Sequence, residues 1–395
     1  MKIKKIIPLL SLIWATNISF AQNPIVQNIL NDVRIDSMTF FVQQLTGEEQ
    51  VVIAGLPDTI HSRQAYQPGN EKAFQFVREK FLGYGLQVDS LQFNATGKNL
   101  LGIKTGTQFP DQKFILGAHY DNVGDSIAPG ADDNASGSAA VMEAARVFSG
   151  YNFPFTIIFA LWDEEELGLL GSNAYASMAA SNDETILGYI NMDMLGWDGN
   201  NDSIADLHVR PVANSLQLAD KAIEADSVYA IGLGLHIVNP GTGATDHAAF
   251  WNNGFTAIGI DEEYDGDFNP FWHTPADSLG QFNLSFYEKC AKLVYATLGE
   301  CALDSVNVLG VEDVSALEQI NIYPNPTANT IFINYPGRIN EIRLYNGLGT
   351  LVNKFKKADN RLVQLDIGYY TDGVYLLQID SDSGTISKKV ILNKR

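Results

Sequence analysis

Between residue 24 and about residue 303, short apolar runs alternate with segments of helical spacing. Residues 155–162 (FTIIFALW) are β-branched and aromatic, whereas residues 137–148 are rich in alanine with helical spacing. Near-continuous apolar strands separated by helices are typical of a mostly parallel sheet covered on both faces. The sequence therefore predicts an α/β domain, with strands at 114–118, 155–162, 186–194 and 256–260 and helices at 137–148, 167–180, 211–226 and 284–298.

The pattern changes near residues 303–318. Beyond them, apolar and polar residues alternate with a period of two in short runs separated by Gly, Asn, Asp and Pro. This alternation predicts strands at 320–323, 330–335, 342–345, 362–365, 374–379 and 385–392. We therefore expect a small all-β sandwich over residues 319–395, joined by a linker at 304–318 to a domain spanning residues 22–303.

The charge distribution supports the same division. Residues 319–395 hold 10 Lys and Arg against 6 Asp and Glu, whereas the rest of the chain holds 16 against 40. The net charge of −20 over 395 residues repels phosphate backbones, so we expect no nucleic-acid partner.

The first 21 residues have the organisation of a secretory signal peptide. A basic start at Lys2, Lys4 and Lys5 precedes a short apolar stretch, and small residues stand before a cut after Ala21. The apolar stretch is shorter than the ~20 residues that a membrane span needs. We therefore expect a secreted or cell-surface protein with no transmembrane segment in its mature form.

The chain has two cysteines, Cys290 and Cys301. Two cysteines exclude a disulfide-stapled scaffold. On one continuous helix they would lie roughly 16 Å apart, too far to bridge, so a disulfide requires the chain to fold back after Gly299.

Metal-ligand residues collect where the predicted strands end and in two nearby loops. They fall at His119 and Asp121, in the acidic run 163–166, at Asp193, in residues 132–134 and at His273. In an open α/β sheet, ligands gather outside the carboxyl ends of the strands. Imidazole nitrogens and carboxylate oxygens are ligands that zinc accepts in catalytic sites. Each residue taken singly has an ordinary structural explanation, such as a helix cap or a turn, but together they predict a metal site.

Five motifs carry a resemblance to a known family. They are GAHYDNV at 117–123, APGADDNASG at 128–137, EELGLLGS at 165–172, NMDMLG at 191–196 and HTPADSL at 273–279. In this order and spacing, they resemble the zinc aminopeptidase family, which includes bacterial leucyl aminopeptidases and, more distantly, glutaminyl cyclases. The resemblance implies two zinc ions per chain and hydrolysis of N-terminal residues from peptides.

The resemblance also implies a role for each metal ligand. His119 and Asp193 would bind one zinc ion, and Glu166 and His273 would bind the other. Asp132 would bridge both ions.

Glu165 would be the general base that takes a proton from the attacking water. The acidic run 163–166 offers several registers, and the family pattern selects the pair directly before Leu167. The family pattern further implies a cis peptide bond after the bridging residue, here between Asp132 and Asp133.

Substrate contacts are expected from Asp246, Tyr264 and Trp272. The free amine of the substrate would bind near Asp193 or the acidic residues 261–263. A pocket for an apolar side chain would use Phe250, Trp251, Tyr264, Phe271 and Trp272, for which ordinary core packing is an equal alternative. The acidic loop 261–267 offers oxygen ligands to calcium, although a solvated loop is the simpler interpretation.

Two other functions compete with the aminopeptidase. Trp272 directly before His273 leans towards a single-zinc glutaminyl cyclase, whereas EELGLLGS and NMDMLG favour a peptidase. A non-catalytic surface-binding protein is disfavoured, because the full set of ligands and a base are present.

The tail resembles the C-terminal sorting domain of type IX secretion substrates. The resemblance rests on YPNPTANT at 323–330, DGVYLLQI at 372–379 and the basic finish KKVILNKR. It implies passage through the outer membrane by that machinery. A carbohydrate-binding sandwich module is the alternative.

Overall fold

The computed structural model describes residues 22–124, 129–304, 321–334, 338–346, 351–358, 362–381 and 384–394. Contacts divide the chain into two compact units, residues 1–309 and 310–395. The expected signal peptide, and all but the first residue of the expected linker, lie outside the described residues.

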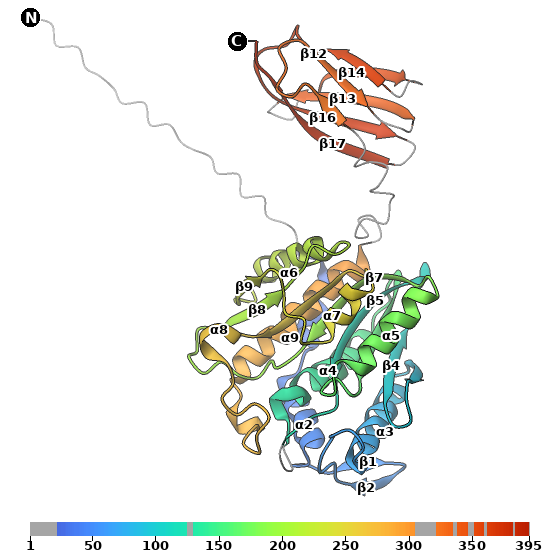
Figure 1. Ribbon diagram of the computed structural model, residues 1–395, viewed down its shortest axis with the longest axis vertical. Helices are drawn as coiled ribbons and strands as arrows, with labels where there is room; N and C mark the ends of the chain where they lie inside the picture. The colour runs from blue at the N-terminus through green and yellow to red at the C-terminus, as the bar shows by residue number, and fades with distance from the viewer. Residues whose placement is uncertain are drawn as a thin grey trace, which may run out of the picture. The chain divides into compact units, whose positions relative to one another are not determined.

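An eight-stranded sheet in the order β3-β4-β6-β5-β7-β10-β8-β9 runs through the first unit (Figure 1). Its strands are β3 (Gln87–Gln92), β4 (Lys98–Lys104), β5 (Phe109–His119), β6 (Phe155–Trp162), β7 (Thr185–Met192), β8 (Ile204–His208), β9 (Gly234–Val238) and β10 (Ala257–Glu262). The central strands β6, β5, β7 and β10 are parallel to one another. Antiparallel pairs join β4 to β6, β3 to β4 and β8 to β10. The predicted α/β sheet is confirmed, with antiparallel strands added on both sides of a parallel centre.

Helices cover both faces of this sheet. One face carries α1 (Pro24–Asp32), α2 (Ile35–Thr46), α3 (Pro68–Gly83), α4 (Gly137–Ser149), α6 (Ser215–Tyr229) and α9 (Leu284–Leu303), and the other carries α5 (Leu170–Ser181) and α7 (His247–Asn252). Along β6, Phe159 and Leu161 join the first apolar cluster, whereas Ala160 and Trp162 join the second. Because both faces are buried, the strand has no polar side, which explains its continuous apolar sequence.

Smaller elements complete the first unit. They are the hairpin strands β1 (Val51–Ile53) and β2 (Leu56–Asp58), the helical turns η1 (Ala131–Ser136) and η2 (Leu279–Gln281), and the short helix α8 (Tyr264–Asp267). The turn η1 leads directly into α4, and α8 and η2 lie in the long connection between β10 and α9. These connections carry part of the site described below.

Helix α9 carries both cysteines. Cys290 and Cys301 are buried and free, on a helix that continues past Gly299 to Leu303. The chain therefore does not fold back after Gly299, which is the condition that a disulfide between the two cysteines required. Among the described residues, no helix combines the length and apolarity that a membrane span requires.

The second unit consists of two antiparallel sheets. The strands are β11 (Asn321–Tyr323), β12 (Thr330–Asn334) and β15 (Leu362–Asp366) in one sheet, and β13 (Ile339–Asn346), β14 (Leu351–Ala358), β16 (Gly373–Ser381) and β17 (Gly384–Leu392) in the other. Ile331 and Ile333 of β12 share one apolar cluster with Leu344 of β13 and Leu377 of β16. The predicted all-β region is confirmed, with its own core.

Candidate metal centre

The carboxyl ends of three neighbouring parallel strands position the site. His119 is the last residue of β5 and pairs with Trp162, the last residue of β6. Asp193 follows the end of β7, and the acidic run 163–166 follows β6. Ligand-type side chains at these strand ends therefore face one pocket, as in other open α/β sheets.

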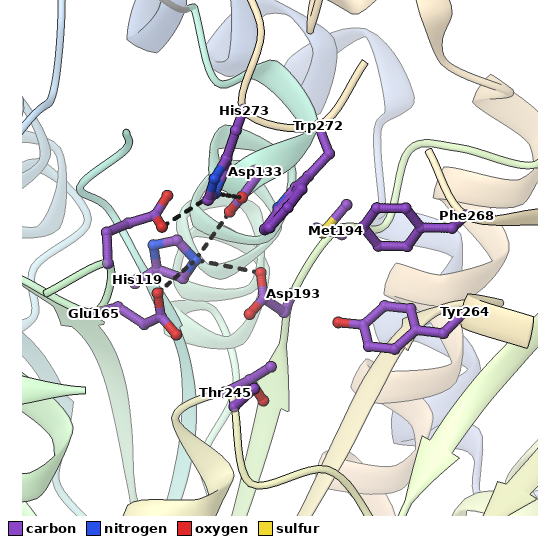
Figure 2. Close-up of a pocket in the computed structure, with 12 residues that line it drawn as sticks. His119, Asp133, Glu165, Asp193, Met194, Thr245, Tyr264, Phe268, Trp272 and His273 are labelled. Atoms are coloured by element: carbon purple, nitrogen blue, oxygen red, sulfur yellow. Dashed lines mark hydrogen bonds and ion pairs between the residues drawn. The ribbon is translucent and has the colours of Figure 1, made fainter. Parts of the chain in front are cut away.

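Two groups of potential metal ligands meet in this pocket (Figure 2). One contains His119, Glu165 and Asp193, and the other contains Asp133, Glu166 and His273; within each group the ligand atoms lie within 4.8 Å of one another. Five of the six residues expected from the sequence are therefore brought together. Among the described residues these are the only such groups, and the acidic loop 261–267, a calcium candidate in the sequence, supplies none.

Asp133, and not the expected Asp132, lies between the two histidines. Its Oδ1 is 3.2 Å from Nε2 of His119, and its Oδ2 is 3.0 Å from Nε2 of His273. Asp132 turns away, because its Oδ1 accepts a hydrogen bond from the Gly196 N–H and its Oδ2 accepts one from Asn269 Nδ2. The residue expected to bridge the two ions is therefore corrected from Asp132 to Asp133.

The cis peptide bond shifts in the same way. It was expected between Asp132 and Asp133, and it lies between Asp133 and Asn134. The Asn134 side chain spans the turn, because its Nδ2 donates to the Met192 carbonyl and its Oδ1 accepts from the Gly137 N–H.

Asp121 supports two parts of the centre, a role that was not predicted from the sequence. Nδ1 of His119 lies 3.2 Å from the Asp121 carbonyl oxygen and 3.4 Å from its Oδ1. The two carboxylate oxygens of Asp121 accept hydrogen bonds from the backbone N–H groups of Glu165 and Glu166, at 3.1 and 3.3 Å. Such a partner orients an imidazole towards a metal. The signal was the aspartate two residues after His119 in GAHYDNV.

The acidic run divides between the pocket and the protein interior. Glu165 and Glu166 line the pocket, in the register chosen from the sequence. Asp163 accepts from Asn70 Nδ2 and the Lys98 N–H instead. Glu164 accepts from Thr96 Oγ1.

Electrostatics at the centre favour a bound cation. Burial raises the pKa of Asp193 to about 8, against the opposing effect of His119. Burial also raises the pKa of Glu165 well above its usual value. For His119 burial acts the other way, but Asp193 and Glu165 outweigh it and raise the pKa of the imidazole well above its usual value. Glu166 Oε1 is buried without a hydrogen-bond partner among the described residues. Buried carboxylates of this kind are stabilised by a metal, and this mixture of nitrogen and oxygen donors fits zinc.

A buried arginine near the centre, Arg63, makes its hydrogen bonds to backbone carbonyl oxygens. Arg63 is fully buried and donates to the carbonyl oxygens of Leu45, Tyr120, Pro129 and Gly130. Its hydrogen bonds therefore hold Pro129 and Gly130 in front of η1, and its charge acts on Asp133 and Glu166 only through space.

The pocket has a volume of about 280 Å³ and an aromatic wall. Tyr264, Phe268 and Trp272 lie across the pocket from His119 and Glu165 (Figure 2). The Trp272 ring stacks on the His273 imidazole with centroids 3.7 Å apart. Two of the three expected substrate contacts, Tyr264 and Trp272, therefore line the pocket.

The third expected substrate contact, Asp246, is buried and does not line the pocket. It precedes α7, next to the pocket residue Thr245, and burial raises its pKa to about 7. Phe250 and Trp251 belong to the core between α7 and the sheet, and Phe271 packs against Trp197. The core-packing alternative is therefore correct for Phe250 and Trp251.

Comparison with known proteins agrees with this geometry. Residues 99–298 match the model of peptidase family M28. The chain belongs to peptidase family M28. Residues 321–393 of this M28 protein match a secretion system C-terminal sorting domain.

Individual relatives show how far the likeness reaches. A probable leucine aminopeptidase of Arthroderma otae is 30% identical over 200 residues, which is 48% of this chain and 53% of that protein. The chain spans about half the length of the curated relatives it matches.

Solved structures share the fold. The LapA aminopeptidase of Legionella pneumophila superposes with a TM-score of 0.62 at 21% identity, covering 77% of this chain and 81% of that one. A glutaminyl cyclase of Bacteroides thetaiotaomicron superposes with a TM-score of 0.55 at 17% identity, covering 67% and 97%.

Proposed function

We propose that this M28 protein is an exported aminopeptidase that uses two zinc ions to hydrolyse N-terminal residues from peptides. The observation that carries the proposal is the pair of three-residue ligand groups, joined by Asp133, whose carboxylate lies between His119 and His273. His119 and Asp193 would hold one ion, Glu166 and His273 the other, and Asp133 both. When bound, zinc supplies Lewis acidity that activates water and polarises a carbonyl group.

Glu165 is the proposed general base. Its side chain lines the pocket and its Oε2 lies 3.9 Å from Nε2 of His119. It takes a proton from the water that attacks the scissile carbonyl carbon. It returns this proton to the amine nitrogen as the carbon–nitrogen bond breaks. A carboxylate whose pKa is raised by burial suits both transfers near neutral pH.

The pocket supports removal of single N-terminal residues. A volume of about 280 Å³ offers room for about one side chain, and its acidic groups attract a free ammonium group. Asp193 is the proposed partner of that ammonium, since Asp261 and Glu262 do not line the pocket. The wall of Met194, Phe268 and Trp272 favours an apolar N-terminal residue.

Export is proposed from both ends of the chain. The sorting-domain match over residues 321–393 supports passage through type IX machinery. The basic and apolar pattern of residues 1–21 supports entry by a signal peptide. The proposed location is outside the cell or on its surface.

The proposal is tested by metal analysis together with a substrate panel. We expect two zinc ions per chain and hydrolysis of leucine p-nitroanilide, but not of its N-acetylated form. The Glu165→Gln variant should keep both ions and lose activity by about 10²- to 10⁴-fold. Cyclisation of a glutaminyl peptide without release of amino acids would favour the single-zinc alternative. A protein that binds no zinc and ignores chelators would contradict the proposal.

A further inference from the structure

The two histidines of the centre are held very differently. His119 ends the central strand β5, and its side chain is 1% exposed. His273 lies in the connection between α8 and η2, with a side chain 28% exposed and a φ of +58°. A non-glycine residue in the left-handed region keeps that conformation only where its surroundings hold it. The structure must therefore supply support for His273 from beyond its own backbone.

That support begins at Asn269, four residues before His273. The Asn269 side chain is buried, and its Nδ2 donates to Asp132 Oδ2 at 2.8 Å. Its Oδ1 accepts from the Phe271 N–H at 2.9 Å, and its own N–H donates to Glu262 Oε1 at 2.8 Å. One amide thus shapes the turn that leads to His273 and ties this turn to Asp132.

A second tie lies four residues after His273. Asp277 Oδ1 accepts from the Asp132 N–H at 2.9 Å, and Asp277 Oδ2 accepts from the Asp133 N–H at 3.2 Å. Asp277 is almost completely buried. The segment that carries His273 is therefore fastened on both sides to the turn that carries Asp133. We call Asn269, Asp132 and Asp277 the Asn269 clasp.

We propose that Asn269 is a positioning residue, which acts through Asp132 to hold His273 against Asp133 and Glu166. The clasp sets the metal affinity of the His273 half of the centre and leaves the half formed by His119 and Asp193 largely unaffected. This inference rests on the proposed two-metal function. It also gives Asp132 a role that its neighbour Asp133 does not share.

The Asn269→Asp variant tests the clasp with little change of shape. It keeps the acceptor for the Phe271 N–H, but it replaces the donor to Asp132 with a second carboxylate. We expect the first metal ion to bind as in the unaltered protein and the second to bind about 10- to 100-fold more weakly. Titration of the metal-free full-length protein with Zn²⁺ against a chromophoric chelator, and with Co²⁺ by visible absorption, measures both steps.

Two further variants separate positioning from general damage. The exchange Asp132→Asn with Asn269→Asp restores a donor and an acceptor at the same two positions and should recover affinity for the second ion. Asn253→Asp is the matched control, because its Nδ2 donates to the Ala249 carbonyl at the end of α7. This control should bind both ions normally.

Combination with ligand variants locates the effect. Added to His273→Ala, Asn269→Asp should weaken metal binding no further, whereas added to His119→Ala it should weaken binding additively. If Asn269→Asp does not fold, Asp277→Asn tests the same clasp, since its amide would face one of the two backbone N–H groups.

Either of two results would overturn the inference. In one, Asn269→Asp binds both ions as tightly as the unaltered protein. In the other, it weakens both ions equally. An unaltered protein that binds fewer than two ions would instead refute the proposed function.

Discussion

At the scale of single residues, adjacent aspartates have separate tasks. Asp133 faces both histidines, whereas Asp132 faces the Gly196 N–H and Asn269. Both carboxylates are buried, so each needs partners, but only Asp133 has partners that are themselves proposed metal ligands. Substitution of Asp133 should therefore weaken metal binding more than substitution of Asp132.

The first prediction compares Asp133→Asn with Asp132→Asn. We expect Asp133→Asn to weaken metal binding by more than about 100-fold, because it removes a proposed direct ligand. Asp132→Asn should weaken it by about 10- to 100-fold, as is typical of a group acting through a ligand. Chelator competition measures both losses. Equal losses would argue that Asp132 also contacts metal.

The second prediction concerns Trp272, which stacks on His273 and forms part of the apolar wall. Trp272→Ala should lower kcat/KM for a leucyl substrate by about tenfold, and less for an alanyl substrate, since a smaller side chain loses less apolar contact. Trp272→Phe should retain part of the preference. An equal loss for both substrates would show that Trp272 does not contribute to the preference for leucine over alanine.

At the scale of elements, helix α7 packs on the sheet through a buried histidine. A side chain at Gly259 of β10 would meet His247 Nδ1 at 2.3 Å, so only glycine leaves room for this ring. Thr245 Oγ1 lies 2.7 Å from the same nitrogen, and the His208 ring stacks on His247 with centroids 5.6 Å apart. Because Thr245 lines the pocket, this packing supports one wall of the site.

The third prediction is that His247 makes the protein acid-sensitive. Burial, with a smaller effect from His208, lowers the pKa of His247 from 6.5 to about 3. Between pH 6.5 and about 3, His247 therefore binds a proton in the unfolded chain but stays neutral in the folded chain. Between these two values the free energy of unfolding falls by about 1.4 kcal/mol for each unit that the pH decreases.

Urea unfolding of the metal-free protein between pH 7 and pH 4 measures this slope. His247→Asn removes the titrating group, so the difference in stability between the variant and the unaltered protein should narrow as the pH falls. A substitution at the exposed His61 is the control. Parallel stability curves for His247→Asn and the unaltered protein would contradict the prediction.

At the scale of the whole molecule, the two units have separate cores and opposite charge. The apolar clusters of the sheet domain contain residues up to Ala302, whereas the cluster of the second unit begins at Ile331. Residues 319–395 carry 10 basic against 6 acidic side chains, unlike the acidic remainder. Units with their own cores can fold independently.

The fourth prediction is that the second unit takes no part in catalysis. A chain that ends at residue 304 should keep kcat/KM within about twofold of the full chain, because every residue of the proposed centre precedes it. Matched assays at equal zinc content measure this ratio. A much larger loss in a folded, zinc-loaded truncation would assign the tail a role in the reaction.

The sequence by itself determined the fold class and the family, and it named most of the residues that meet in the proposed centre. A continuous apolar run such as 155–162 is suited only to burial on both faces, and period-two alternation beyond residue 318 is suited to a half-buried strand. His119 and Asp193 could be placed because the position of a strand end fixes where its last side chains meet.

Tertiary structure alone decided which of two adjacent aspartates faces the histidines. Side chains in the irregular turn η1 follow no period, so their directions depend on contacts with Gly196, Asn269 and Asp277, which are distant in sequence. Packing likewise assigned Phe250 to the core and Trp272 to the pocket. Local patterns specify where a strand ends, but the direction of a side chain in a loop is set by long-range contacts that the same patterns do not encode.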